Sequence, residues 1–286
     1  KMIAGGSATE TSYAATAPTL NVKIDEVEGV DAAAVDMNVD ITVTGLDAKY
    51  LVAGSADAKS IDSTFGAASM AMVIKATNPE DASNVDMTVN VADLSGSTKG
   101  TFLGVAMMEN MAEALKAGFN AEGSFSYGKT TFDMNVTEAK GPTKVTGSAD
   151  SGNVTFALDK TRMAYGIGGK GMAMTVSGPE TPFPEVKVTY SEALFNLLMP
   201  VSKSDVPEDF AFTTKLVDFA ISEDIWAMFD PTGNLPHDPA TVIIDTKGKA
   251  RLTVDITDTK ATEALGDAPP GELHALELTE LRASIA

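Results

Sequence analysis

Three glycines, Gly166, Gly168 and Gly171, have the spacing G-x-G-x-x-G that is found in dinucleotide-binding loops. Such a loop binds a pyrophosphate only where it opens a helix, because the N-terminal N–H groups of that helix face the phosphates. The residues that follow here, Met172–Val176, have the composition of a strand. We therefore expect a glycine-rich hairpin or strand bend and no dinucleotide site.

Acidic side chains at alternate positions, around Asp36, Asn38 and Asp40, resemble the start of a calcium-binding loop. An EF-hand loop also needs Gly at its sixth position and Glu at its twelfth, where this chain has Ile and Asp. Alternation with Met and Val predicts instead an extended strand with a solvated acidic face. The remaining alternative is a low-affinity cation site formed by stacked strands, from Asp36, Asp86 and Asp133.

A histidine beside an aspartate, His237 and Asp238, lies between prolines in a stretch that predicts a rigid loop. His and Asp are two of the three residue types of a hydrolase triad. The third, a serine in a G-x-S-x-G nucleophile elbow, does not occur in the chain. The second histidine, His274, lies in a predicted strand. The 40 Asp and Glu residues make chance carboxylate pairs unavoidable, so spacing nominates no acid–base pair. We predict no catalytic residue and a non-enzymatic protein, with a hydrolase as a distant third hypothesis.

Composition excludes further classes of chemistry. The 286 residues include no Cys and only two His, which leaves no disulfide framework, thiolate site or multi-His metal site. We therefore predict no metal site and no cofactor. The net charge of −19 argues against nucleic acid and anionic membranes as partners. No apolar run reaches 18 residues, so no membrane-spanning segment is predicted.

The apolar residues are rich in methionine, with 14 Met in a chain that is only 6% aromatic. Met adapts to irregular shapes, so it serves both ordinary cores and surfaces that accept varied apolar ligands. Met residues that could line such a groove are Met70, Met72, Met87, Met107, Met108, Met111, Met172, Met174 and Met199. The ligand-binding residues that we nominate are Met107, Met108, Met111, Leu115, Trp226, Met228 and Phe229. Ordinary core filling by the same side chains is the alternative.

Period-two alternation of apolar and polar residues dominates the chain and predicts half-buried antiparallel strands. It is clearest over Met37–Val43, Val85–Val91 and Phe132–Val136. Further strands are predicted at Thr19–Ile24, Tyr50–Gly54, Ser69–Lys75, Val154–Leu158, Gly171–Val176, Glu185–Tyr190, Glu208–Phe219, Ala240–Asp245, Ala250–Ile256 and Glu272–Ile285. Turn residues, among them Ser151–Asn153 and Lys247–Gly248, separate these strands. The predicted fold class is mainly β, an elongated curved antiparallel sheet in meander order.

A weak self-similarity accompanies the strands. Val35–Ile41 recurs fifty positions later as Val85–Val91, and Phe132–Val136 is a fainter third copy. Chance similarity between alternating strands explains this equally well. If the repeat is real, it predicts stacked hairpins that extend one sheet and do not close it.

Two or three short helices are expected to cover the sheet. They are Val105–Ala117, ending at Gly118, then Ile221–Phe229 with Ser222 as N-cap, and a single turn at Lys260–Leu265. No linker divides the chain, so residues 1–286 are predicted to form one elongated unit with a softer boundary near 178–183. The missing start Met and the apolar residues close to the end suggest a fragment of a longer exported protein.

The region from Ser177 to Leu281 carries a specific resemblance. The segments are Pro182-Phe183-Pro184, Phe195–Pro200, Leu216-Val217-Asp218, Ile225–Pro231, Leu235–Thr241 and Pro269–Leu273. With them the chain resembles the Gram-negative family known as domain of unknown function twenty-one twenty-five. The resemblance implies an exported, periplasmic protein and brings no catalytic residue. His237 stands where Arg is expected in that family, so it supports no role for this residue.

Two functions of different classes follow. The first is a non-enzymatic periplasmic β-protein that binds or shields an apolar small molecule or lipid, or an apolar partner, in the cell envelope. The second is a structural or interaction module of the envelope that binds an envelope protein and no small ligand. Sequence cannot separate them, because Met and Val in a groove have the same pattern as Met and Val in a core.

Overall fold

The computed structural model describes residues 1–7, 9–28, 35–55, 57–78, 82–179, 181, 183–234, 239–252, 255–258, 260 and 273–285. These residues form fourteen strands and three short helices, α1 (Val105–Met108), α2 (Met111–Lys116) and α3 (Glu223–Phe229). The strands are β1 (Met2–Gly6), β2 (Glu10–Glu28), β3 (Val35–Gly54), β4 (Ala58–Asn78), β5 (Ser83–Leu103), β6 (Asn120–Tyr127), β7 (Thr130–Glu138), β8 (Gly141–Ala149), β9 (Ser151–Leu158), β10 (Arg162–Ser177), β11 (Val186–Pro200), β12 (Glu208–Ile221), β13 (Ala240–Leu252) and β14 (Leu273–Ile285).

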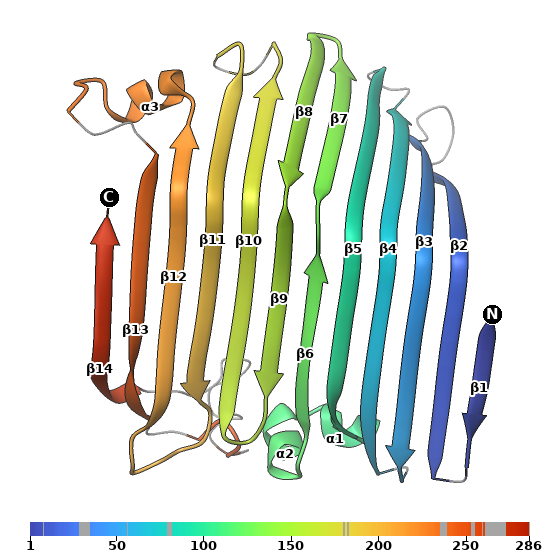
Figure 1. Cartoon of the computed structure of the whole chain (residues 1–286), viewed down its shortest axis with the longest axis vertical. Coiled ribbons are helices and arrows are strands. Elements are labelled where there is room, and N and C mark those ends of the chain that lie inside the picture. Colours follow the sequence, from blue (N-terminus) through green and yellow to red (C-terminus); the bar gives the residue numbers. More distant parts are fainter. Residues whose placement is uncertain are drawn as a thin grey trace.

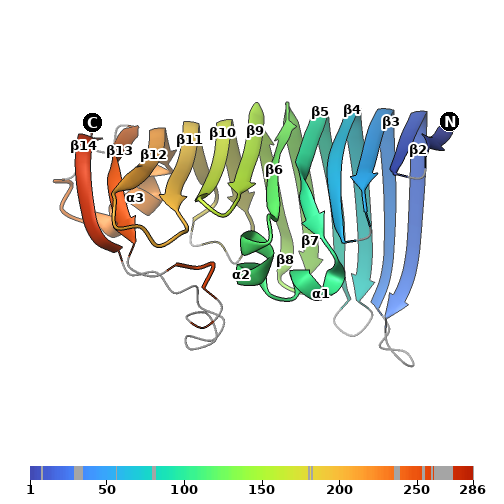
Figure 2. The same cartoon turned by 90° about the horizontal axis from the view of Figure 1, so that it is seen from below.

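All fourteen strands of the described residues belong to one antiparallel sheet whose order follows the chain from β1 to β14 (Figure 1). The centre departs from a simple meander. There β6 and β7 lie end to end beside β5, and β9 and β8 lie end to end beside β10 (Figure 1). The predicted fold class, mainly β with an antiparallel meander, is confirmed, and Figure 2 shows that the sheet is curved. The sheet continues from β10 to β11 across the predicted boundary at 178–183.

Side chains at paired positions of neighbouring strands point to the same face, so the register shows which residues share a face. In the half of the sheet that contains β7 and β8, which is the upper half of Figure 1, Ile41 pairs with Met72, Met72 with Val89, and Val89 with Phe132 of β7. The residues beside this row are also apolar. We call this side of the sheet the apolar face. In the upper half it comprises Leu20, Val22, Ile24, Val39, Ile41, Val43, Met70, Met72, Ile74, Met87, Val89, Val91, Phe132, Met134, Val145, Met172, Met174, Val176, Val188 and Tyr190.

Halfway along the strands, the alternation of side chains reverses. Four residues at this level have positive φ: Gly45 (66°), Asp93 (52°), Gly171 (62°) and Asp218 (51°). Where a residue within a strand has a left-handed backbone conformation, the alternation after it is reversed, so each later side chain lies on the face opposite to the one expected. The cross-strand pairing keeps its register on both sides, as between Thr44↔Ser69 and Asp47↔Gly66. We call this level the reversal row.

Below the reversal row the apolar face continues with larger rings. Pairing and ring contacts place Tyr13, Tyr50, Tyr127 and Tyr165 on this half of the face, with Phe65, Phe125, Phe156, Phe195 and Phe212. Ring centroids lie 6.0 Å apart for Phe65–Phe125 and 5.6 Å apart for Phe195–Phe212. Other apolar side chains of this half are Leu46, Ala67, Leu94, Val154, Ile167, Leu197, Leu216, Val242 and Ile244. The apolar face is therefore continuous across the sheet.

The opposite side, the polar face, consists mainly of Ser, Thr, Asn, Asp, Glu and Lys. Side-chain hydrogen bonds cross the strands between Ser95 and Ser126 (2.7 Å) and between Ser97 and Ser124 (3.0 Å). Lys23 pairs with Asp40 at 3.0 Å. The solvated acidic face that the sequence predicts around Asp36 and Asp40 is confirmed, since both side chains are exposed. These contacts lie at the surface, so they specify pairing more than they stabilise it.

The helix predicted over Val105–Ala117 is wrong as a single element. Asn110 interrupts it, because its side chain accepts a hydrogen bond from the Glu113 N–H (3.2 Å) and caps α2. The prediction that this stretch ends at Gly118 is confirmed, with φ at 105°. The predicted helix Ile221–Phe229 begins instead at Glu223. Its N-cap, Ser222, makes no side-chain hydrogen bond to the helix because the hydroxyl bonds the Lys187 backbone.

Helix α2 and the lower end of the apolar face form a small core. Leu115 and Phe119 are buried there and pack against Phe102, Ala121 and Leu158. Figure 2 shows α1 and α2 beneath the middle strands of the sheet, which extends beyond them on both sides. Among the described residues this core therefore covers only a small part of the apolar face.

Two sequence expectations about strands need correction. The strands predicted at Ala240–Asp245 and Ala250–Ile256 are one strand, β13, because Lys247–Gly248 forms a register shift and not a turn. Ser151–Asn153, predicted as a turn, begins β9.

The fifty-residue similarity places its copies in β3 and β5, on either side of β4, with Met37 opposite Ala76 and Ala76 opposite Val85. The copies are thus offset by two residues in the sheet. The turn at Lys260–Leu265, apart from Lys260, and the loop of His237 lie outside the described residues.

Candidate functional site

Two hollows lie next to each other on the apolar face, at the level of the reversal row. The first, about 390 Å³, extends from β4 to β10 and is almost wholly apolar. Its large lining side chains are Met70, Val91, Leu94, Phe125, Tyr127, Phe132 and Met172. The second, about 430 Å³, extends to β12 and is lined by Tyr127, Ile167, Tyr190, Ala193, Phe195 and Leu216, among others. Because Tyr127 lines both hollows, they adjoin each other across the strands, and we call the two together the trough.

Aromatic rings lie over glycines of the adjacent strand and form part of the floor of the apolar face. A Cβ added to Gly96 would collide with the Phe65 ring, and one added to Gly147 would collide with the Phe132 ring. The Phe156 ring covers Gly123 in the same way, 2.6 Å from the added Cβ. Such rings lie against the backbone, as aromatic side chains do where they shield strand glycines. The result is a smooth apolar surface.

The side chains of this face are open to solvent to an unusual degree. Phe65, Tyr165 and Ile167 are 40%, 41% and 45% exposed. Soluble proteins seldom expose contiguous apolar patches of this extent without a ligand or partner to cover them. The exposed apolar area, combined with the trough, makes the apolar face the candidate site.

Two tyrosines add polar groups to the trough. The Tyr127 hydroxyl lies over Gly152, and the Tyr190 hydroxyl lies 3.2 Å from a Cβ added to Gly169. Burial raises the pKa of Tyr190, and the nearby Tyr127 raises it further. Both effects keep the Tyr190 phenol neutral, as a hydrogen-bond donor, near neutral pH.

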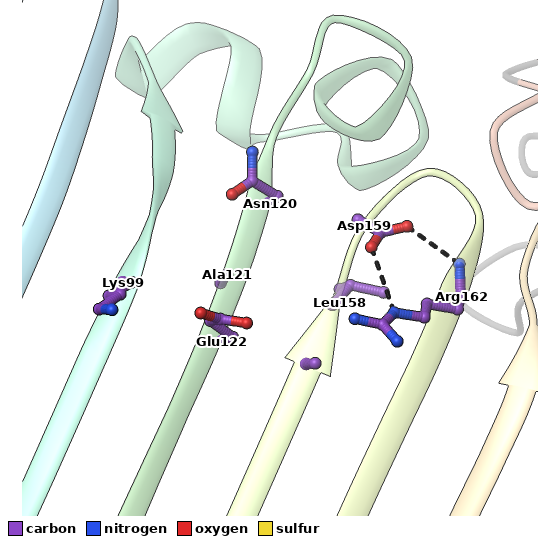
Figure 3. Close-up of a pocket in the computed structure, with 8 residues that line it drawn as sticks. Lys99, Asn120, Ala121, Glu122, Leu158, Asp159 and Arg162 are labelled. Carbon is purple, nitrogen blue, oxygen red and sulfur yellow. Dashed lines mark hydrogen bonds and ion pairs between the residues drawn. The ribbon is translucent and has the colours of Figure 1, made fainter.

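A third hollow, of about 310 Å³, lies at the end of the sheet that is lower in Figure 1, and Figure 3 shows it in close-up. Lys99 and Glu122 belong to neighbouring strands, Asp159 lies in the β9–β10 turn, and Arg162 begins β10 (Figure 3). Burial alone would raise the pKa of Asp159, but hydrogen bonds from Thr161 and Arg162 outweigh it and lower that pKa. Since the Asp159 carboxylate already accepts from the Thr161 N–H (2.7 Å) and the Arg162 N–H (3.1 Å), it serves to close the turn.

The nominated ligand-binding residues lie in two separate places and not in the trough. Met107, Met108, Met111 and Leu115 belong to α1 and α2 at the lower end of the sheet, whereas Trp226, Met228 and Phe229 belong to α3 at the upper end (Figure 1). Leu115 is buried and Met108 packs against that core, while Met111, Met228 and Phe229 are exposed. The structure brings neither group to the trough, and their role in binding stays a prediction.

The broader methionine set fits the trough better. Met70 and Met172 line it, and Met72, Met87, Met174 and Met199 lie elsewhere on the apolar face. Sequence reasoning missed Phe125, Tyr127 and Tyr190. Alternation over Phe125 and Tyr127 was available as a signal, since Ser124 precedes Phe125 and Ser126 lies between the two rings. The reversal at Asp93 and Gly171 hid the common face of these side chains.

The described residues contain no group of three or more His, Asp and Glu side chains able to hold a metal ion, so Asp36, Asp86 and Asp133 form no such cluster. Within the same residues, no helix has the length and apolar character needed to cross a bilayer. Comparison of the chain with protein-family models, with curated proteins and with solved structures gives no match. The family resemblance described above therefore stays a prediction.

Proposed function

We propose that this protein is a non-enzymatic periplasmic β-protein whose apolar face binds or shields an apolar ligand, a small molecule or lipid, in the cell envelope. The observation that carries the proposal is the continuous, solvent-open apolar face with its transverse trough. The periplasmic location rests on the resemblance between residues 177 and 281. No side chain is assigned a catalytic role.

The energetics of covering this face support the proposal. Complete burial of one large apolar side chain contributes about 1.5–3 kcal/mol. The side chains that line the trough are partly exposed, so a ligand that covers several of them gains enough to offset the cost of association. Micromolar affinity requires about 8 kcal/mol. A hydrocarbon ligand can reach this value by desolvation alone.

A matched pair of variants on β5 tests the proposal. Val91→Asp puts a carboxylate into the trough, whereas Asn90→Asp puts the same group on the polar face one residue away. Native mass spectrometry and solvent extraction would measure apolar adducts of the purified wild-type protein and both variants. We expect an adduct on the wild type and on Asn90→Asp, and its loss in Val91→Asp. Equal adducts in both variants, or repeated absence of any adduct from the wild type, would contradict the proposal.

The second candidate function, an interaction module of the envelope, is favoured by one observation. Within the described residues β14 pairs with β13 along one edge, and its apolar side chains Leu278 and Leu281 are 41% and 63% exposed. An open strand edge of this kind can add a strand from a partner protein. Isolation of a stable complex with an envelope protein, from wild-type protein free of any small ligand, would favour this function over the first.

A further inference from the structure

The two tyrosine hydroxyls of the trough lie next to each other. Tyr127 covers Gly152 and Tyr190 approaches Gly169, and these two glycines are direct cross-strand partners in β9 and β10. Cβ positions of such a pair are about 4.5–5.5 Å apart. Among the described residues neither hydroxyl has a protein hydrogen-bond partner. Two phenol donors are therefore available, side by side, on a mainly apolar surface.

The position of these donors within the trough is central. From β4 to β12 the trough crosses six inter-strand steps, or roughly 29 Å at about 4.8 Å a step. Gly152 and Gly169 belong to the third and fourth strands after β4 along that path. Apolar lining continues on both sides, from Met70 and Val91 on one side to Phe195 and Leu216 on the other. A ligand that fits has an acceptor in its middle and an apolar arm on each side.

The charge of the trough defines the ligand further. Among the described residues that line the two hollows, Lys215 is the only charged one, and its strand position between Thr214 and Leu216 directs its side chain to the polar face. With a net charge of −19, the chain as a whole repels anions. An anionic head group would find no cation in the trough, whereas a neutral carbonyl would find two donors.

Resting on the proposed function, we propose that the ligand is a neutral long-chain ester, whose carbonyl oxygen accepts hydrogen bonds from Tyr127 and Tyr190 while its two hydrocarbon arms lie along the trough. One lipid chain spans half of a bilayer core, about 15 Å. Two hydrocarbon arms of this length, placed end to end, therefore match the length of the trough. An ester has this two-armed shape. A free fatty acid carries its charge at one end, and a quinone carries its carbonyls at one end.

The test uses three probes delivered from cyclodextrin: decyl decanoate, the alkane heneicosane, which has no acceptor, and the oleate anion. Dissociation constants are measured for the wild-type protein and for the double variant Tyr127→Phe with Tyr190→Phe, which keeps both rings. We expect the wild type to bind decyl decanoate about tenfold more tightly than heneicosane, as two net hydrogen bonds imply. The double variant is expected to lose this difference and to keep its affinity for heneicosane.

The control is the double variant Tyr13→Phe with Tyr50→Phe. These rings form another tyrosine pair on the apolar face, 6.4 Å apart and outside the two hollows, so the preference for the ester is expected to persist. Equal binding of ester and alkane by the wild type, or tightest binding of oleate, overturns the ester inference and leaves the proposed function standing. Failure of all three probes to bind the wild type overturns both.

Discussion

Glycines beneath aromatic rings have a defined structural role in this sheet. Gly96 and Gly147 lack the Cβ that would occupy the space of the Phe65 and Phe132 rings. Each ring covers backbone that a glycine leaves exposed, and each glycine lets the ring lie flat. These pairs join neighbouring strands, so they specify register as well as surface shape.

Gly96→Ala is expected to destabilise the protein by about 1–3 kcal/mol, the usual cost of an added methyl that displaces packed side chains. Urea unfolding followed by circular dichroism measures the change. Gly66→Ala is the control, because its added Cβ has only one ordinary contact, 3.7 Å from the Leu94 carbonyl oxygen. It is expected to be neutral or slightly stabilising. Equal destabilisation by both variants would show that the Phe65 ring does not rest on Gly96.

The Asp159 turn predicts a local dependence of stability on pH. Hydrogen bonds from Thr161 and Arg162 lower the pKa of Asp159 in the folded state despite its partial burial. A carboxyl with a lowered folded pKa contributes stability above its unfolded pKa, near 3.9, and this contribution is lost as pH falls through the folded value. Asp159→Asn is therefore expected to lower the urea midpoint at pH 7 and to reduce its fall between pH 5 and pH 2.

The matched control is Asp62→Asn, the same chemical change on the polar face. It is expected to leave the urea midpoint at pH 7 close to the wild-type value, since surface substitutions away from special contacts have small effects. An Asp159→Asn protein with the midpoint and the pH profile of the wild type would show that the turn gains nothing from this carboxylate.

At the scale of elements, the reversal row explains why some strands could be predicted and their lengths could not. The alternation of Met37 to Val43 was sufficient to locate β3 and to identify its buried side. Before Gly45 the residues of the apolar face have odd numbers, and after it they have even numbers. The pattern therefore predicts Tyr50–Gly54 as a separate strand, although β3 is continuous. Periodicity detects a strand only while its phase is constant, and a left-handed residue shifts that phase without ending the strand. The trough lies at this level, which is why the sequence did not predict it.

Gly45→Ala tests the reversal row. The φ of 66° costs a residue with a Cβ about 1–2 kcal/mol, and the added Cβ would also lie 3.1 Å from the Ala68 Cβ. We expect a fall in the free energy of unfolding of at least this size in urea denaturation. Gly45→Asn is the comparison, because Asn tolerates left-handed φ better than Ala. If Ala were as well tolerated as Asn, strain in the reversal row would not be significant.

At the scale of the whole molecule, the described residues form a single curved sheet layer in place of the usual pair of packed layers. The buried apolar residues of the described chain are few, and those that cluster, Ala114, Leu115 and Phe119, lie at the ends of the middle strands. Cross-strand pairs on the apolar face therefore supply much of the apolar contact. A sequence with a packed core and a sequence with an open apolar face share the same alternation, so the sequence could predict the sheet but not that one face is open.

An open apolar face predicts that the folded, delipidated protein binds a hydrophobic dye such as ANS, which normally reports loss of tertiary structure. Here the fluorescence is expected at full native ellipticity, and urea unfolding is expected to abolish it. Saturation with an apolar ligand is expected to displace the dye and raise the free energy of unfolding by about 2.7 kcal/mol at a hundredfold excess over the dissociation constant. Val91→Asp is expected to weaken dye binding, and Asn90→Asp to leave it unchanged. Absence of dye binding by delipidated, folded wild-type protein would mean that the apolar face is covered in solution.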